Sequence, residues 1–330
     1  MMDSSYIWQK GKKLLGTKYA ILGGAMSWVS EHNLVSAISN AGGFGVIACG
    51  SMGPDLLDKE IKATQKLTKM PFGVNLITMH PELEQLIETC KSNNVTHVVL
   101  AGGLPKSNMI DALKTSGIKV IAFAPALVIA KKLVKMGVDG IVIEGMEAGG
   151  HIGPVSTLVL AQEILPFLKD QVPIFVAGGI GKGEAIAQFL RMGAAGCQLG
   201  TRFVCAEESI AHENFKNIFL KSQARDTMVS QQLDPNFPVI PVRAIANKGT
   251  YEFNQIQRKA IDEYQSGNLS KEEAQLMIEK FWAGALRKAV IDGDIEYGSV
   301  MAGQSVGMVS SKQTVAEIIN ELVAQTYATY

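Results

Sequence analysis

The sequence lacks long apolar runs and any excess of charge. Its 31 Lys and Arg residues balance 31 Asp and Glu residues, so no basic surface of the kind that binds nucleic acid or anionic membranes is expected. No apolar run approaches the ~20 residues of a membrane span. The first twenty residues contain neither the apolar core nor the cleavage site of a secretory signal. We therefore expect a cytoplasmic protein with no nucleic-acid or membrane partner.

Cysteine is also scarce, and its spacing forms no known motif. The four residues are Cys49, Cys90, Cys197 and Cys205. No pair has the CxxC spacing, and no His-rich tract accompanies them. We expect reduced thiols in the core and no metal site.

What the sequence does contain is an alternation of short apolar segments with longer helical ones. Strands that are apolar almost throughout indicate burial on both faces, as in parallel sheets. Eight βα units favour a closed (β/α)8 TIM barrel. The alternative, a doubly wound open sheet, more often has roughly five to seven strands. The predicted strands are residues 18–26, 43–50, 71–77, 96–102, 118–125, 140–147, 172–180 and 195–204.

After residue 205 the alternation stops. Residues 230–253 are rich in Pro and Asn and predict a long loop. Ser270 begins a helical segment with the spacing of a capping box. We expect a C-terminal helical subdomain that covers the barrel mouth. The predicted parts are a lead-in (1–17), the barrel (18–215), a loop-helix insertion lining the active site (216–310) and a C-terminal helix packing on the barrel (311–330).

One late helical segment, "FWAGALRKAV" (281–290), is unusually apolar. We expect the apolar face of such a helix to be covered, either by another chain or by another part of the same chain. Two interpretations stay open, a homodimer contact and packing against the barrel of the same chain.

Glycines cluster where the predicted strands end, which is where barrels of this class place their active sites. Gly178 and Gly179 lie at the end of the predicted seventh strand, and Gly200 and Thr201 lie in the eighth. They offer backbone N–H groups and one hydroxyl at the usual phosphate site of such barrels. The many glycines suggest a large flat ligand, and a phosphate ligand with a broad planar body suggests FMN.

Two other phosphate motifs fail in this segment. A P-loop needs Ser or Thr after the Gly-Lys pair, but Gly183 follows Lys182. A Rossmann fingerprint needs a third glycine where Ile186 stands. The barrel phosphate site therefore remains the interpretation.

The segment "EGMEAGGHIG" (144–153) places one histidine at the end of the sixth strand. Imidazole exchanges protons near neutral pH, so His151 is predicted to be the acid–base residue, with capping of the next helix as the alternative. Glu144 is predicted to face the ligand, with a buried ion pair to Lys or Arg as the alternative. The other four histidines are expected to be structural.

Taken together, these segments resemble the nitronate monooxygenase (2-nitropropane dioxygenase) family, which includes flavin-dependent enoyl-ACP reductases. The resemblance runs from about residue 20 to residue 310 in the family's order. "EAGGHxG" followed by "AGGI" and "GTRF" is highly specific. It is carried by "GGAMSWVSEHNLVSAISNAGGFGVI", "PFGVNL", "EGMEAGGHIG", "VAGGIGKG", "QLGTRFVCAEES" and "GSVMAGQSVG".

The resemblance implies a TIM barrel with noncovalent FMN and His151 as the catalytic residue over the flavin ring. It also implies that residues 298–309 fold back over the flavin, so that Ala302 lines the site. Gly24 and Met26 would lie against the flavin, Asn75 and Glu144 would hydrogen-bond it, and Gly178, Gly179, Gly200 and Thr201 would take its phosphate. The remaining implied FMN-binding residues are Gly150, Gln198, Met301 and Gln304.

Two reactions follow from the resemblance. In the first, FMN oxidises an alkyl nitronate, O₂ reoxidises the flavin, and the products are a carbonyl compound and nitrite. In the alternative, NAD(P)H reduces FMN, which then reduces an enoyl thioester. Segment 230–250 is longer and richer in Pro than expected of the reductases. The nitronate reaction is therefore the leading hypothesis, and both reactions predict a small-molecule substrate.

Overall fold

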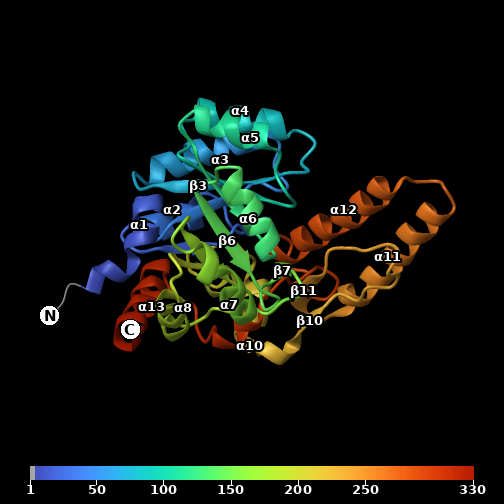
Figure 1. Cartoon of the computed structure of the whole chain (residues 1–330). Coiled ribbons are helices and arrows are strands. Elements are labelled where there is room, and N and C mark those ends of the chain that lie inside the picture. The colour runs from blue at the N-terminus through green and yellow to red at the C-terminus, as the bar shows by residue number, and fades with distance from the viewer. Residues whose placement is uncertain (1–3) are drawn as a thin grey trace.

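The computed structural model describes residues 4–330 (Figure 1), and its centre is a closed barrel of parallel strands. The strand order is β1-β9-β8-β6-β5-β4-β3-β2, and a parallel bridge between Leu22 and Phe44 joins β1 to β2. The predicted (β/α)8 barrel is confirmed. The first three residues of the predicted lead-in 1–17 lie outside the described residues. The barrel strands are β1 (Ile21–Gly23), β2 (Gly45–Ala48), β3 (Phe72–Ile77), β4 (His97–Ala101), β5 (Lys119–Phe123), β6 (Gly140–Glu144), β8 (Ile174–Ala177) and β9 (Gly196–Leu199).

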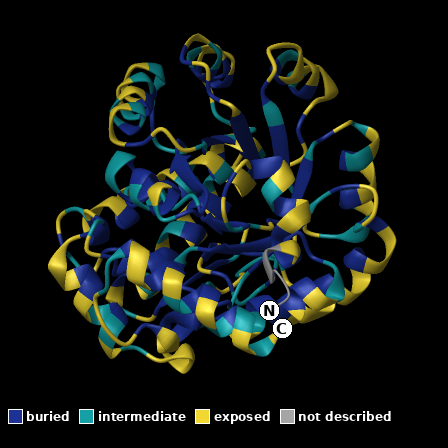
Figure 2. Ribbon diagram, turned by 90° about the vertical axis from the view of Figure 1, so that its left-hand side faces the viewer, coloured by how far each residue is buried: buried dark blue, intermediate teal, exposed yellow. Residues whose placement is uncertain are grey.

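Helices surround the barrel, with buried strands inside and exposed residues on the outer helix faces (Figure 2). None of the helices within residues 4–330 combines the length and apolarity needed to cross a membrane. The first of these helices are η1 (Ser4–Trp8), α1 (Gln9–Leu15), α2 (His32–Asn40), α3 (Pro54–Leu67), α4 (Leu83–Ser92), α5 (Ser107–Thr115) and α6 (Leu127–Lys135). Further along lie α7 (Thr157–Leu168), α8 (Gly183–Met192), α9 (Thr201–Val204), α10 (Glu213–Lys221), η2 (Ala224–Asp226), η3 (Gln304–Met308) and α13 (Val315–Thr329).

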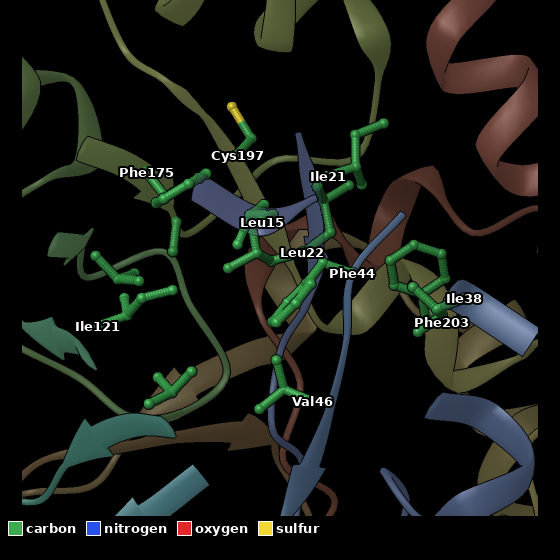
Figure 3. Packing of buried hydrophobic residues seen from close by; sticks show 14 of the residues in the cluster. Leu15, Ile21, Leu22, Ile38, Phe44, Val46, Ile121, Phe175, Cys197 and Phe203 are labelled. Atoms are coloured by element: carbon green, nitrogen blue, oxygen red, sulfur yellow. The ribbon is translucent and has the colours of Figure 1, made fainter. Parts of the chain in front are cut away.

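The barrel core is packed by side chains from the strands and from α1. Leu15, Leu22 and Phe44 lie close together in it (Figure 3), and each is fully buried. His97 lies at the start of β4, where its Nε2 is 2.9 Å from the carbonyl oxygen of Leu14. Burial lowers the pKa of His97 to about 4, so this histidine is neutral and structural, as predicted.

The four cysteines are free and buried, as predicted. Burial raises the pKa of Cys49 to about 12. A thiol with so high a pKa holds little thiolate at neutral pH, so it is unreactive. These residues therefore act as small apolar side chains in the core.

A second, antiparallel sheet lies beside the barrel, and the sequence did not predict it. Its order is β10-β11-β7. The strands are β10 (Thr227–Val229), β11 (Val242–Ile245) and β7 (Gly150–His151). The prediction that 230–253 is one long loop was therefore wrong, because β11 and the first turns of α11 lie within it.

One other boundary needs correction. The last predicted barrel strand, 195–204, ends at Leu199 in the structure, and the short helix α9 begins at Thr201. The apolar residues of α9 suggested a strand, but they are buried as one helical turn after Gly200.

Helices α11 (Lys248–Gln265) and α12 (Lys271–Val290) form a hairpin that projects from the barrel, which we call the helical arm (Figure 1). The predicted cap at Ser270 is present, since Ser270 and Glu273 form a capping box. The arm has a hydrophobic cluster of its own that contains Phe253, Ile278 and Trp282.

The apolar segment 281–290 spans two cores rather than presenting an open face. Trp282 packs in the cluster of the arm, whereas Leu286 and Val290 belong to the core of the barrel. This burial supports the second interpretation, packing within the chain. The homodimer stays a prediction, now without this segment to support it.

The close contact between β9 and the preceding chain makes a stability prediction. A Cβ atom on Gly196 would lie 2.1 Å from the carbonyl oxygen of Ala20. Gly196→Ala should therefore lower the free energy of unfolding by about 1–3 kcal/mol, the usual cost of overpacking. Gly284 is exposed on α12 with nothing within 4 Å of its Cβ position, so Gly284→Ala should raise stability by about 0.5–1 kcal/mol. Urea denaturation measures both, and equal effects would contradict this packing.

Candidate active site

The C-terminal ends of the barrel strands, here called the barrel mouth, bring four predicted residues together. A Cβ atom on Gly24 would lie 3.5 Å from the Cα of Gly200 and 3.6 Å from Nε2 of Gln198. A Cβ atom on Gly200 would lie 3.4 Å from Sδ of Met26. The ends of β1 and β9 therefore meet closely, with an amide and a thioether beside them.

Backbone N–H groups at the next strand end are free to bind a ligand. Gly178 and Gly179 have φ values of 103° and 69°, a conformation that glycine adopts without strain. The N–H groups of Gly179, Ile180 and Gly200 donate no hydrogen bond to any residue of the described chain. Unpaired N–H groups at the ends of two neighbouring strands suit an anion.

Residues 298–309, here called the returning segment, fold back onto the barrel mouth. The N–H of Gly303 donates to Oγ1 of Thr201 at 2.9 Å. The N–H of Gln304 donates to the carbonyl oxygen of Glu147, also at 2.9 Å. A Cβ atom on Gly149 would lie 2.5 Å from the nitrogen of Gly303. The glycines of "EAGGH" and "MAGQ" therefore allow the backbone after β6 and the backbone of the returning segment to pack in direct contact.

Met301 joins this segment to the second sheet. It forms an antiparallel bridge with Ala244, and its Sδ lies 3.5 Å from the Cβ position of Gly150. The structure thus places Met301 and Gly150 side by side, and their role in binding a cofactor stays a prediction.

Two polar residues lie on barrel strands, and no hydrogen bond or ion pair joins either to the other site residues. Asn75 on β3 donates from Nδ2 to the carbonyl oxygen of Val99 at 3.0 Å. Glu144 ends β6 and makes no side-chain hydrogen bond or ion pair within residues 4–330, so the structure does not show the alternative ion pair with Lys or Arg. Burial raises the pKa of Glu144 to about 8, so its carboxyl group is largely protonated at neutral pH and can donate a hydrogen bond.

His151 lies on β7, opposite Val242 of β11. Its Nε2 is 3.1 Å from Oε2 of Glu279 on α12, and its side chain is 41% exposed. It does not cap the next helix, because α7 begins after Ser156 without a side-chain cap. Instead, Oε2 of Glu147 accepts from the N–H of Thr157 at 2.9 Å.

Three residues at this site were not predicted. Besides Glu279, they are Arg243, which is buried and donates to the carbonyl oxygen of Met146 at 2.9 Å, and Trp28. Trp28 has φ of 66°, and the guanidinium of Arg287 on α12 lies 5.8 Å from its ring centroid. The signals were weak, since a single Arg in a Pro-rich stretch and single charges on a helix are common.

A separate polar cluster comprises Glu31, His32 and Glu60, whose potential ligand atoms lie within 4.8 Å of one another. Hydrogen bonds account for it. Glu31 caps α2 by accepting from the N–H of Asn33, and Nδ1 of His32 lies 2.8 Å from Oε2 of Glu60. We assign this cluster a structural role.

Comparison with known proteins identifies the family. Residues 9–325 match the family described as nitronate monooxygenase. The chain belongs to this family. The Rhodococcus jostii enzyme named 5-hydroxy-7a-methyl-1-oxo-octahydro-1H-indene-4-carboxyl-CoA dehydrogenase is 29% identical, and the match covers 94% of each chain. A Staphylococcus saprophyticus protein named probable nitronate monooxygenase is 28% identical over 93% of this chain and 94% of its own.

A solved structure gives the same result for the fold. FabK from Thermotoga maritima is similar with a TM-score of 0.84 and 33% identity, covering 96% of each chain. The family and the names of these relatives make this nitronate monooxygenase family member an oxidoreductase.

The raised pKa of Glu144 makes a stability prediction. Between its ordinary 4.5 and about 8, the folded chain holds a proton that the unfolded chain has lost. The free energy of unfolding of the ligand-free protein should therefore fall as pH rises through this window, by on the order of a few kcal/mol. Glu144→Gln should flatten that decline.

The matched control is Glu163→Gln, which removes an exposed carboxylate from α7. Urea denaturation between pH 5 and pH 9 compares the three proteins. Parallel stability profiles for wild type and Glu144→Gln would contradict the assigned pKa.

Proposed function

We propose that this chain is an FMN-dependent oxidoreductase whose substrate is an acyl thioester. The observation that carries the FMN assignment is the set of free N–H groups at Gly179, Ile180 and Gly200 beside the Thr201 hydroxyl. This arrangement fits a phosphate monoester, and it is covered by the returning segment. When bound, FMN would supply two-electron hydride-transfer chemistry.

Most of the predicted site residues would bind the cofactor, and one would carry out acid–base chemistry. Gly178, Gly179, Gly200 and Thr201 would hold the phosphate. Gly24, Met26, Gly150, Gln198, Met301 and Gln304 would lie along the cofactor.

Two more side chains would hydrogen-bond the cofactor. The Oδ1 of Asn75 is free to accept, because Nδ2 holds the Val99 carbonyl. The protonated carboxyl of Glu144 would donate to a ring or ribityl oxygen. A hydrogen-bond partner would offset the cost of keeping these polar groups, one buried and one half-buried, away from water.

His151 is the proposed acid–base residue. In the reduction of an α,β-unsaturated (enoyl) thioester, a hydride that originates from NAD(P)H would add to the β-carbon as the C=C π bond breaks, and His151 would supply or orient the proton that the α-carbon takes up. Its exposed imidazole can exchange that proton with solvent.

The thioester class rests on the relatives and on one structural finding. The Rhodococcus relative is named for a carboxyl-CoA substrate. The sequence argument against a thioester was the Pro-rich segment 230–250. In the structure this segment supplies β11 and the fully buried Phe237, which packs in the cluster of the arm. The segment is therefore part of the arm core and no longer argues against a thioester.

A second candidate is nitronate oxidation by O₂, the leading hypothesis from sequence. The family match and the names of the Staphylococcus relatives favour it. His151 would then bind the nitronate anion or remove the α-proton of a nitroalkane.

Anaerobic stopped-flow separates the two reactions. For thioester chemistry, NADH or NADPH should bleach the visible flavin absorbance, and a crotonyl thioester should restore it. For nitronate chemistry, an alkyl nitronate alone should bleach it, with NAD(P)H inert. A purified protein without flavin would contradict both proposals.

His151→Ala should leave FMN bound and lower turnover by about 10²–10⁴-fold, the usual contribution of acid–base catalysis. His212→Asn is the matched control, since Asn preserves the cap that His212 gives to α10. Its turnover should equal that of wild type. Full activity in His151→Ala would remove His151 from the mechanism.

A further inference from the structure

His151 and Glu279 come from distant parts of the chain, and the second sheet holds them together. His151 is on β7, and its partner in the ladder is Val242 of β11. Val242 belongs to the hydrophobic cluster of the helical arm, together with Ile278, the neighbour of Glu279 on α12. The packing that docks the arm therefore also sets the distance between the imidazole and the carboxylate.

The contact between His151 and Glu279 involves one particular nitrogen of the imidazole ring. Nε2 of His151 lies 3.1 Å from Oε2 of Glu279. A lone pair on Nε2 would face the negatively charged oxygen at this distance and be repelled by it, so the contact favours a proton on Nε2. In the neutral imidazole the proton is then on Nε2, and Nδ1 has the lone pair.

No other charged group competes for this carboxylate among the described contacts. Arg243, a cation on the second sheet, donates instead to the carbonyl oxygen of Met146 and to Oγ1 of Thr227. Oε2 of Glu279 therefore interacts with His151 alone within residues 4–330.

We propose that Glu279 is a positioning residue for His151: it holds a proton on Nε2, so that Nδ1 is the nitrogen that takes up a proton from solvent and passes it to the substrate. This rests on the proposed acid–base role of His151. A carboxylate that orients an imidazole and stabilises its protonated form is a general device of acid–base catalysis. Because both side chains are more than a third exposed, the pair contributes little to the stability of the fold. Loss of Glu279 should therefore change the tautomer of the His151 imidazole and leave the stability of the fold unchanged.

The test compares flavin-loaded wild type, Glu279→Ala and the matched control Glu272→Ala. Glu272 is exposed on the same helix, one heptad away, and its side chain makes no hydrogen bond or ion pair within residues 4–330. With ¹⁵N-labelled histidine, long-range ¹H–¹⁵N NMR reports the tautomer of each ring, and the His151 signals are assigned by their loss in His151→Ala.

In wild type and Glu272→Ala, His151 should show the Nε2–H tautomer. In Glu279→Ala it should show a mixture of both tautomers. The rate of flavin reoxidation by the thioester should fall at least about tenfold, within the roughly 10²–10⁴-fold that acid–base catalysis contributes. Reduction by NAD(P)H and the melting temperature should not change.

An unchanged tautomer and an unchanged reoxidation rate in Glu279→Ala would overturn the proposal. The tautomer is measured without turnover, so this outcome is distinct from failure of the proposed function. If His151→Ala remains fully active, the catalytic role of His151 fails, whatever the NMR spectra of Glu279→Ala show.

Discussion

The four residues of β11 make the contacts on which the rest of the site depends. Val242 pairs with His151 and packs into the core of the helical arm. Arg243 pairs with Gly150, and Ala244 forms a bridge with Met301. Ile245 lies opposite Thr227 of β10 in the antiparallel ladder. One short strand thus joins the catalytic candidate, the arm and the returning segment. Any change that loosens β11 should displace all three together.

The site therefore has two halves of different physical origin. The first is made by the barrel itself, where glycines at the ends of β1, β8 and β9 bring backbones into contact and leave N–H groups unpaired. It is rigid because the barrel core is closely packed. The second half is assembled from β7, α12 and residues 298–309. The geometry of this second half depends on contacts between distant parts of the chain. A rigid first half would suit the proposed cofactor, and a second half built from separate segments would suit the substrate.

The sequence predicted the barrel well because strands buried on both faces are apolar throughout, a strong local signal. It also singled out the glycines at the strand ends and His151, whose catalytic role stays a prediction. It missed β7, β10 and β11 because strands of two to four residues show no useful periodicity. It missed Glu279 because the partner of His151 lies on a distant helix. Only resemblance, and no local pattern, placed the returning segment over the mouth.

The most direct test of this account is a crystal structure of the protein purified with its flavin. The account predicts an FMN phosphate bound by the N–H groups of Gly179 and Gly200, with the flavin ring covered by Met301 and facing His151. A phosphate bound elsewhere, or a ring on the far side of the barrel from β7, would contradict it.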